Sequence, residues 1–530
     1  MTMKKIIYFM TALMLGGATL TSCDNYLDTV QSKGNDEVLT SGKQVEALFA
    51  NSDMFNTKSI CNVYASDDYG LTTDIFDALG FVDGGIADAM TWNIDDLVNN
   101  PYGDEAWSAE YQKIFNANLV LNNIDELTDA SEEKKTEYAA QAHMLRAMAM
   151  WSLVNTYCLP YSAQNASSLG LPLKQTTSYE EGMERATLQQ TYDFILADLD
   201  EAAKTANTQI ADNKRWWVSR PAVEAMKARV YLFMQDYDKA ATYASEALRS
   251  GDAQLDDYNH LGYRVAQVSL DGELQDVKYS ELYRYGDNLV ANYKENYLSE
   301  YYSTTDYALI PSEELMSLYD QDNDLRYKQF FNKYALWEQG IGGFGDDILY
   351  HKFKDRIQSG PTVPEMLLTE AEALARQGKW QETMPLVNQL RRARIDKNAD
   401  DIELSATNQE EAVKTILEER HREMPFVMRW WDVRRLSCNE VTYDDVTLER
   451  TFYRVSDESV DDSELDHYVL PVGSKRYAQP IIDLEITRSN GQIEQNTYDG
   501  NSVQITQLEM PGGDEGGEEG GDEDNEDYYE

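Results

Sequence analysis

The sequence has few of the residues from which catalytic and nucleic-acid-binding sites are commonly built. Its 530 residues include five histidines, four cysteines, and 46 lysines and arginines against 94 aspartates and glutamates. Basic side chains hold nucleic acids by displacing counterions, so a net charge of -48 argues against a nucleic-acid partner. With 42% hydrophobic residues the chain can still bury a core, which excludes disorder throughout.

Catalytic motifs are also missing. The sequence contains no Gly-x-Ser-x-Gly, no Walker glycine loop, no Gly-x-Gly-x-x-Gly after a predicted strand and no His-Glu-x-x-His. The histidines are scattered, and His143, on a predicted helix with Arg146, is expected to be solvated or locally hydrogen-bonded. Carboxylates are abundant, so a glycosidase-like pair stays open, because such a pair is defined by distance in space. We predict a protein that is not an enzyme, with no catalytic residues, cofactor or metal ligands.

One acidic stretch imitates the start of a calcium-binding loop. Asp320, Asp322 and Asp324 alternate as the first ligands of an EF-hand do. However, Leu325 stands at the sixth position, where that loop needs glycine, and Phe331 at the twelfth, where it needs glutamate. We expect a solvated turn here.

The amino terminus has the three-part pattern of an export signal. Two lysines, an apolar run over residues 6–15 and small residues lead to Leu20-Thr21-Ser22-Cys23. This pattern predicts a secretory signal peptide over residues 1–22 and not a membrane-spanning helix. Leu-x-Ser-Cys also resembles a bacterial lipobox, in which Cys23 would be acylated and become the first mature residue. Several acyl chains on one residue would anchor the protein stably.

The carboxyl terminus differs from the rest of the chain. Residues 511–530 hold ten acidic residues, six glycines and no basic residue, which predicts a disordered tail. Without that tail and the two leader lysines, residues 23–510 still carry a net charge of -40. Cys61, Cys158 and Cys438 form no disulfide pattern, so we expect small buried thiols.

Between these ends, helical periodicity dominates. Mostly apolar residues recur at three- and four-residue spacing in two stretches: Trp107, Tyr111, Ile114, Asn118, Leu121 and Ile124, and Tyr138, Ala142, Leu145, Ala149 and Leu153. These patterns predict two amphipathic helices packed on one another. Trp92 and Trp107 are expected to fill the core.

A helix-turn-helix unit occurs twice, at residues 225–248 and 368–391. In each copy an Ala-rich helix is followed by an aromatic residue and by a second helix with small or aliphatic residues: Tyr237, Ala240 and Ala244 in the first, Trp380, Thr383 and Val387 in the second. This is the tetratricopeptide pattern. The two copies predict a stacked helical scaffold interrupted by a long insertion.

The insertion, roughly residues 252–360, is rich in tyrosine. Tyr279, Tyr283 and Tyr285 alternate with polar residues as in a strand, and the chain has 35 tyrosines against 14 phenylalanines. A tyrosine offers an apolar ring face and a hydroxyl, which suits the recognition of polar, ring-shaped or peptide ligands. Most of these tyrosines would nevertheless pack at half-buried positions.

Eight short motifs over about residues 23–500 together resemble the SusD/RagB family. They are the lipobox followed by Asp24-Asn25-Tyr26-Leu27-Asp28, Trp107-x-x-x-Tyr111-x-x-Ile114-x-x-Ala117-Asn118, His143-Met144-Leu145-Arg146-Ala147, Leu169-Gly170-Leu171-Pro172-Leu173, Lys227 to Leu232, Pro364 to Ala373, Ile416 to Glu423, and Tyr468 to Val472 with Gln495-Asn496. Each motif is weak alone, and their common order makes the match specific.

The resemblance implies a mainly α fold, in which tetratricopeptide-like helix pairs form a helical scaffold with loop-rich insertions and minor β-structure. Residues 23–510 would form one ligand-binding domain. Family members are surface lipoproteins of the outer membrane that act as lids on a TonB-dependent, SusC-like transporter. They capture oligosaccharides, or in some branches peptides, and pass them on without chemistry.

The resemblance also implies ligand contacts, by neighbourhood in the chain. Aromatic residues before the first long helix and after the second helix pair would stack on sugar rings, and nearby polar groups would bind hydroxyls. The expected ligand-binding residues are Tyr69, Phe76, Asn292, Tyr301, Tyr302, Asp306 and Tyr307.

Three alternatives stay open from the sequence. A peptide-binding, RagB-like member would suit an acidic body that attracts neutral or cationic peptides. A surface glycoside hydrolase would need two carboxylates at catalytic separation. A structural surface-layer or adhesin component would bind no ligand and would self-associate.

Overall fold

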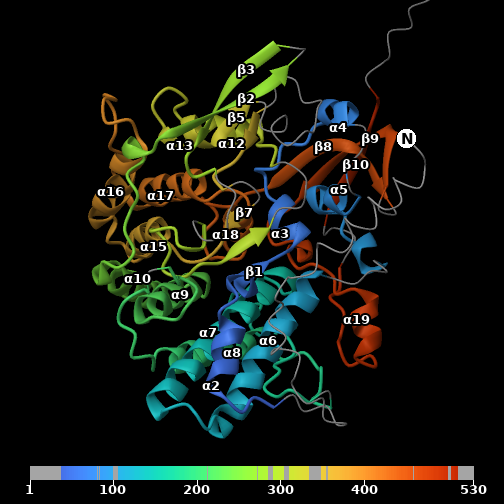
Figure 1. Cartoon of the computed structure of the whole chain (residues 1–530). Helices are drawn as coiled ribbons and strands as arrows, with labels where there is room; N and C mark the ends of the chain where they lie inside the picture. Colours follow the sequence, from blue (N-terminus) through green and yellow to red (C-terminus); the bar gives the residue numbers. More distant parts are fainter. Residues whose placement is uncertain are drawn as a thin grey trace, which may run out of the picture.

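The computed structural model describes residues 38–510 except 80–81, 83, 100–104, 179, 212, 271–272, 284–289, 304–308, 334–347, 354–355, 457–458 and 499–502. The expected leader, Cys23 and acidic tail therefore lie outside the described residues. Helices form most of the regular structure, which confirms the predicted mainly helical class (Figure 1). No helix in the described ranges is long and apolar enough to cross a membrane.

The helices follow the chain in this order: α2 (Gly42–Phe49), α3 (Ile60–Tyr64), α4 (Thr73–Leu79), α5 (Gly84–Thr91), α6 (Glu105–Asn123), α7 (Glu132–Tyr157), α8 (Leu188–Ala202), α9 (Arg220–Phe233), α10 (Tyr237–Ser250), α12 (Glu313–Ser317), α13 (Leu325–Phe330), α15 (Val363–Arg376), α16 (Met384–Arg394), α17 (Gln409–Glu423), α18 (Val427–Leu436) and α19 (Asp483–Arg488).

The strands form small, separate sheets. Their bounds are β1 (Asn56–Thr57), β2 (Tyr263–Leu270), β3 (Glu273–Ser280), β4 (Tyr301–Ser303), β5 (Phe331–Lys333), β6 (Ile348–Tyr350), β7 (Arg356–Gln358), β8 (Leu448–Ser456), β9 (Ser459–Leu470) and β10 (Gln504–Leu508). β4 lies between β1 and β7, β9 lies between β10 and β8, and β2–β3 and β5–β6 are antiparallel pairs. The sheets therefore join segments that are far apart in the sequence.

The two long helices predicted from periodicity are α6 and α7, and they pack on one another as expected. The Ser131 hydroxyl caps α7 by accepting a hydrogen bond from the Lys134 backbone, which starts the helix at this point. Trp92 and Trp107, each 2% exposed, lie in the core as predicted. Cys61 and Cys158 are buried thiols, and Cys438 is half-buried.

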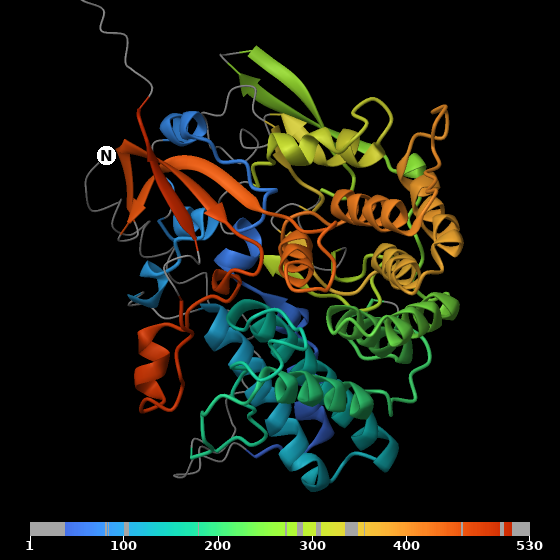
Figure 2. The ribbon, with the colours of Figure 1, turned by 180° about the vertical axis from the view of Figure 1, so that it is seen from behind.

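Both helix-turn-helix repeats are present, as α9–α10 and as α15–α16 with a short 3-10 helix between the members of the second pair. Gln235, with a φ of 62°, makes the turn before Asp236 caps α10. The copies are far apart in the sequence, yet α10 packs against α15, and Figure 2 shows the two pairs side by side. The predicted stacked scaffold with an insertion is therefore confirmed.

In its described part, the insertion between the repeats contains β2 to β7 and the short helices α12 and α13. Of the tyrosines expected in a strand, Tyr279 lies in β3, Tyr283 follows it, and Tyr285 lies outside the described residues. The acidic stretch is a turn, in which the Asp320 carboxylate accepts hydrogen bonds from the backbone of Asp322 and Asn323. The expectation of a solvated turn is wrong for Asp324, because this residue is 1% exposed and paired with Arg326 at 2.7 Å.

A buried ion-pair network joins the repeats to the helices that follow them. Arg229 of α9 binds Glu365 of α15 at 2.6 Å, and Arg435 of α18 binds Glu372 of α15 at 2.7 Å. On α17, Glu423 binds Arg394 of α16 at 2.8 Å. Removing one partner of such a pair leaves an uncompensated charge in the core, so the network fixes how these helices pack.

We expect Glu423→Gln to lower the free energy of unfolding by about 3 kcal/mol, because the Arg394 guanidinium would lose a charged partner. Glu410→Gln on the same helix is the matched control, since Glu410 pairs with Lys414 at the surface. Its cost should stay below about 1 kcal/mol. Urea denaturation of the parent and the two variants measures these changes in the free energy of unfolding. Equal losses of stability in both variants would contradict a structural role for the network.

Candidate functional site

Tyr301 and Tyr302, predicted to stack on a ligand, lie in the core. Their exposed fractions are 1% and 0%, because β4 is enclosed between β1 and β7. The Tyr302 hydroxyl lies 2.9 Å from Ser152 Oγ and accepts a hydrogen bond from Asn62 Nδ2 at 3.3 Å. A ring buried on both faces cannot stack on a sugar. The predicted ligand role of these two residues is therefore wrong for this structure, and they join β4 to α3 and α7 instead.

Tyr69 is also a core residue. It is 2% exposed, and its ring packs edge-on against Tyr64 at a centroid distance of 4.9 Å. The prediction that Tyr69 contacts a ligand is corrected by this burial. Asn292 is half-buried next to Arg215, whose backbone N–H donates to Asn292 Oδ1 at 3.3 Å, and its ligand contact stays a prediction.

Of the predicted aromatic residues that the structure describes, Phe76 is the one that stays partly accessible. It is half-buried on α4, and it packs edge-on against Phe452 and Tyr453 of β8 at 5.7 and 5.8 Å. The Tyr453 hydroxyl donates to Asp77 Oδ2 at 2.9 Å, which ties α4 to the sheet. Asp306 and Tyr307 lie outside the described residues, so their ligand contacts also stay predictions.

α4 and the β2–β3 hairpin project from the same end of the molecule, at the top of Figure 1. We call these two elements the hairpin end. Tyr263, Val265 and Leu274 of the hairpin are 47%, 56% and 69% exposed, an unusual group of accessible apolar side chains for so acidic a chain. Sequence analysis missed Tyr263, although its alternation with Val265 in a strand-like run was a usable signal.

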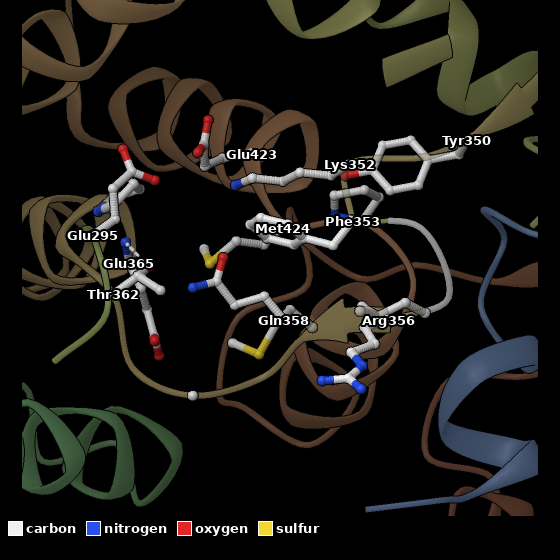
Figure 3. A pocket seen from close by; sticks show the side chains of 15 residues that line it. Glu295, Tyr350, Lys352, Phe353, Arg356, Gln358, Thr362, Glu365, Glu423 and Met424 are labelled. Atoms are coloured by element: carbon white, nitrogen blue, oxygen red, sulfur yellow. Dashed lines mark hydrogen bonds between the residues drawn. The ribbon is translucent and has the colours of Figure 1, made fainter. Parts of the chain in front are cut away.

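A small cavity lies deeper, between the insertion and α17 (Figure 3). It encloses about 30 Å³, which suits one water molecule and not a sugar. The Lys352 ammonium reaches it and lies 5.5 to 5.9 Å from the ring centroids of Tyr258, Tyr293, Phe330 and Phe353. Burial lowers the pKa of Lys352, while Glu295 and Glu423 act in the opposite direction. This is a packed structural centre.

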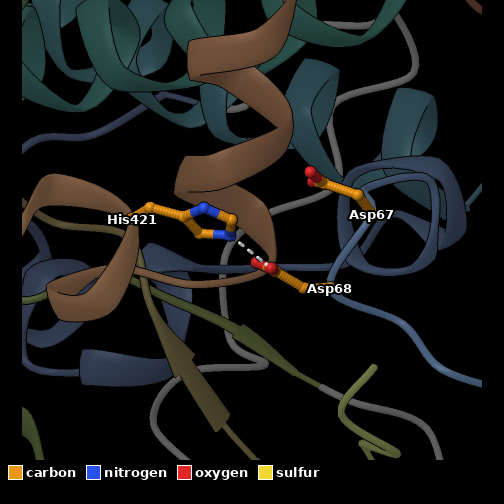
Figure 4. Close-up of side chains that lie close together, drawn as sticks. All are labelled: Asp67, Asp68 and His421. Atoms are coloured by element: carbon orange, nitrogen blue, oxygen red, sulfur yellow. Dashed lines mark hydrogen bonds and ion pairs between the residues drawn. The ribbon is translucent and has the colours of Figure 1, made fainter. Parts of the chain in front are cut away.

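Asp67, Asp68 and His421 form a compact cluster whose possible ligand atoms lie within 4.8 Å of one another (Figure 4). Asp68 already accepts from Phe426 N at 2.6 Å and lies 2.5 Å from His421 Nε2. Burial acts to raise the pKa of Asp67, but Arg429, which donates two hydrogen bonds to this carboxylate, holds the pKa well below its usual range. Both carboxylates already bind protein groups, which favours a structural role for this cluster over a metal site. We call Asp67, Asp68 and His421 the Asp68 cluster.

The Asp68 cluster connects the loop before α4 to α17 and α18. Asp68 also offers its backbone carbonyl to Ser312 N at 2.8 Å. Phe426 has a φ of 64°, a left-handed conformation that non-glycine residues rarely adopt, and its N–H is bound by the Asp68 carboxylate. The loop that leads to Phe76 is therefore fixed to the helical scaffold.

Glu300 is a buried carboxyl next to β4. It is 2% exposed and accepts a hydrogen bond from Ser359 Oγ at 3.0 Å. Burial raises its pKa to about 7, Glu110 adds to the shift, and Lys113 and Arg229 oppose it. This group therefore changes charge near neutral pH.

Two family models match the chain. One, described as starch-binding and associating with the outer membrane, matches residues 26–232, and the SusD family model matches residues 363–498. SusD-like protein P38 of Formosa agariphila is 24% identical over 394 residues, which cover 64% of this chain and 75% of that protein.

Solved structures share the fold. A SusD superfamily protein from Bacteroides thetaiotaomicron aligns with a TM-score of 0.62 at 17% identity, covering 86% of this chain and 98% of that one. A laminarin-binding SusD-like protein aligns with a TM-score of 0.54 at 18% identity, covering 85% and 97%.

Tyr302→Phe should lower the free energy of unfolding by about 1 to 2 kcal/mol, because Ser152 and Asn62 lose a buried partner in the core. Ligand affinity should not change. The free energy of unfolding of Tyr263→Phe, a change at an exposed position, should stay within about 0.5 kcal/mol of the parent value. Chemical denaturation measures both, and a Tyr302→Phe protein that keeps full stability but loses ligand would reverse the assignment.

The raised pKa of Glu300 makes a prediction about pH. The folded state favours the protonated carboxyl of Glu300, so its stabilising contribution is complete below the ordinary glutamate pKa of 4.5 and is lost as pH rises towards about 7. Over that window the loss should be on the order of 3 kcal/mol.

Glu300→Gln keeps a neutral group at this position and should remove the loss of stability at rising pH. The variant should therefore gain stability relative to the parent between roughly pH 5 and roughly pH 8, as followed by denaturation at each pH. The stability of the control Glu410→Gln should change with pH as that of the parent does. A stability difference between Glu300→Gln and the parent that is the same at every pH would refute the raised pKa of Glu300.

Proposed function

This chain belongs to the SusD/RagB family, and on that premise we propose that it is a lipid-anchored outer-membrane protein that captures oligosaccharides at the cell surface. It would pass them to a TonB-dependent, SusC-like transporter. The two family models match in chain order and flank the insertion that carries the β2–β3 hairpin, and this arrangement is the observation on which the proposal rests.

The site that we propose for capture is the hairpin end. Phe76 and Tyr263 offer accessible ring surface for the apolar face of a sugar, and Asp74 and Asp77 on α4 offer acceptors for its hydroxyls. Asp306 and Tyr307 are kept as proposed contacts. The fixed loop from Asp68 to α4 would hold this surface in place while the ligand binds.

Capture without chemical change agrees with the absence of catalytic motifs from the sequence. The acylated Cys23 would keep the protein at the membrane, because several acyl chains on one residue bind a bilayer stably. Delivery would then need only a hinge-like movement of the protein relative to the transporter.

Calorimetry of the soluble protein that starts after Cys23, against neutral oligosaccharides and mixed peptides, tests the proposal. Phe76→Ala, Tyr263→Ala and Tyr307→Ala should each weaken saccharide binding by about tenfold, because each removes a stacking face. Tyr243→Ala is the matched control, since Tyr243 is a half-buried ring on α10, away from the hairpin end.

The alternatives give different results in the same samples. Binding of peptides alone would favour a peptide receptor, and cleaved saccharides in the product analysis would identify a hydrolase. Saccharide binding that survives all three substitutions would remove the hairpin end as the capture site.

A further inference from the structure

A second and larger hollow lies away from the hairpin end. It is a groove between α6, the loop over residues 174–183 and α19, and it encloses about 420 Å³. This volume lies in the range of small-molecule sites, roughly 300 to 1,000 Å³. None of the side chains that line it belongs to α4, the hairpin or β4. Figures 1 and 2 both place α6 and α19 in the half of the molecule opposite the hairpin.

The floor of the groove is a row of aromatic rings on α6. Trp107, Tyr111 and Phe115 follow one another at four-residue spacing, so they lie on one face with a rise of about 6 Å between neighbours. Tyr111 and Phe115 are half-buried and line the groove, while Trp107, which also lines it, is almost fully buried.

The floor is rigid. The rings of Trp107 and Tyr111 are 4.7 Å apart, and Tyr157 packs edge-on against Trp107 at 5.0 Å. The Tyr111 hydroxyl donates to the Pro172 carbonyl at 3.1 Å. A preformed aromatic floor loses little conformational entropy when a ligand stacks on it.

One wall of the groove is also preformed. Asn118 Nδ2 donates to the carbonyls of Lys174 and Thr176, both at 3.2 Å, and Arg146 holds Asn118 Oδ1 at 2.6 Å. From the other side, the Glu181 carboxylate accepts from Thr176 N at 3.0 Å. These hydrogen bonds fix the loop beside α6, where it forms one side of the groove.

The rim is polar but electrically balanced. Lys174 lies 3.3 Å from Glu181 Oε2, and Arg488 lies 2.6 Å from Glu485 Oε1. Because Lys174 and Arg488 each face a carboxylate, the described residues that line the groove offer no uncompensated positive charge for an acidic ligand. Gln112, Thr176 and Ser178 are exposed there and supply neutral hydrogen-bonding groups.

We propose that this α6 groove is a second saccharide-binding site, for a short neutral oligosaccharide segment. Sugar rings would lie with their C–H faces on Tyr111 and Phe115, and their hydroxyls would reach the neutral rim. Uronic acids and sulfated sugars are disfavoured because the acidic body repels them and no free cation compensates. A long glycan held at both the hairpin end and the groove would bind with avidity.

The test uses the full-length protein, purified from membranes in a detergent without a sugar headgroup. Its affinity is measured by calorimetry for a panel of neutral oligosaccharides, matched uronic-acid oligosaccharides and mixed peptides. Two variants act on the groove: Phe115→Ala removes a stacking face, and Gln112→Trp places a large ring in the opening from an exposed position. Asn122→Trp is the matched control, because Asn122 is exposed on the same helix but does not line the groove.

Both groove variants should weaken the binding of at least one neutral oligosaccharide by about tenfold, and Asn122→Trp should not. Unchanged saccharide affinity in both groove variants would overturn the proposal, even if the hairpin end binds saccharide as proposed above. Binding in the groove of acidic saccharides or peptides alone, or no saccharide binding at millimolar concentration, would also overturn it. Gln112→Trp keeps the test valid if Phe115→Ala does not fold.

Discussion

The buried ion pairs between the helical repeats and α17–α18 are the constraint on which the rest of the structure depends. Arg435 donates two hydrogen bonds to Glu372, both at 2.7 Å, and Arg420 binds Asp432 at 2.6 Å, all within the core. Charges taken out of water are tolerated only when their partners are well placed, so each pair permits few arrangements of the helices that carry it. The network therefore favours one packing of α9, α15, α17 and α18.

That fixed scaffold explains how a long insertion can be accommodated between two halves of a helical stack. α10 and α15 meet directly, so the chain between them contributes surface and not the main frame. Recognition is commonly carried by such segments, because a loop can vary without loss of the core that supports it. The Asp68 contacts to Phe426 and Ser312 then connect the insertion and the loop to α4 with the frame.

The two aromatic surfaces differ in how they are built. At the hairpin end Phe76 lies on a short helix that has no buried residue of its own, packed on a β-sheet. In the α6 groove, Tyr111 and Phe115 project from a long helix of the scaffold, and the facing loop is held by Asn118. A surface on a rigid helix keeps its geometry without a ligand, whereas a surface on a short peripheral element depends on fewer contacts.

The sequence by itself determined the long helices α6 and α7 and the two helix-turn-helix repeats, because three- and four-residue periodicity is a local signal. It also identified Trp92 and Trp107 as core residues. Only the tertiary structure decided which tyrosines are buried: Tyr302 is buried and Tyr263 is exposed. Tyr302 is enclosed by strands and helices distant in the chain, while Tyr263 begins a hairpin that projects from the body. Local sequence cannot distinguish these two environments, because burial is set by the segments that pack on a residue and not by its neighbours in the chain.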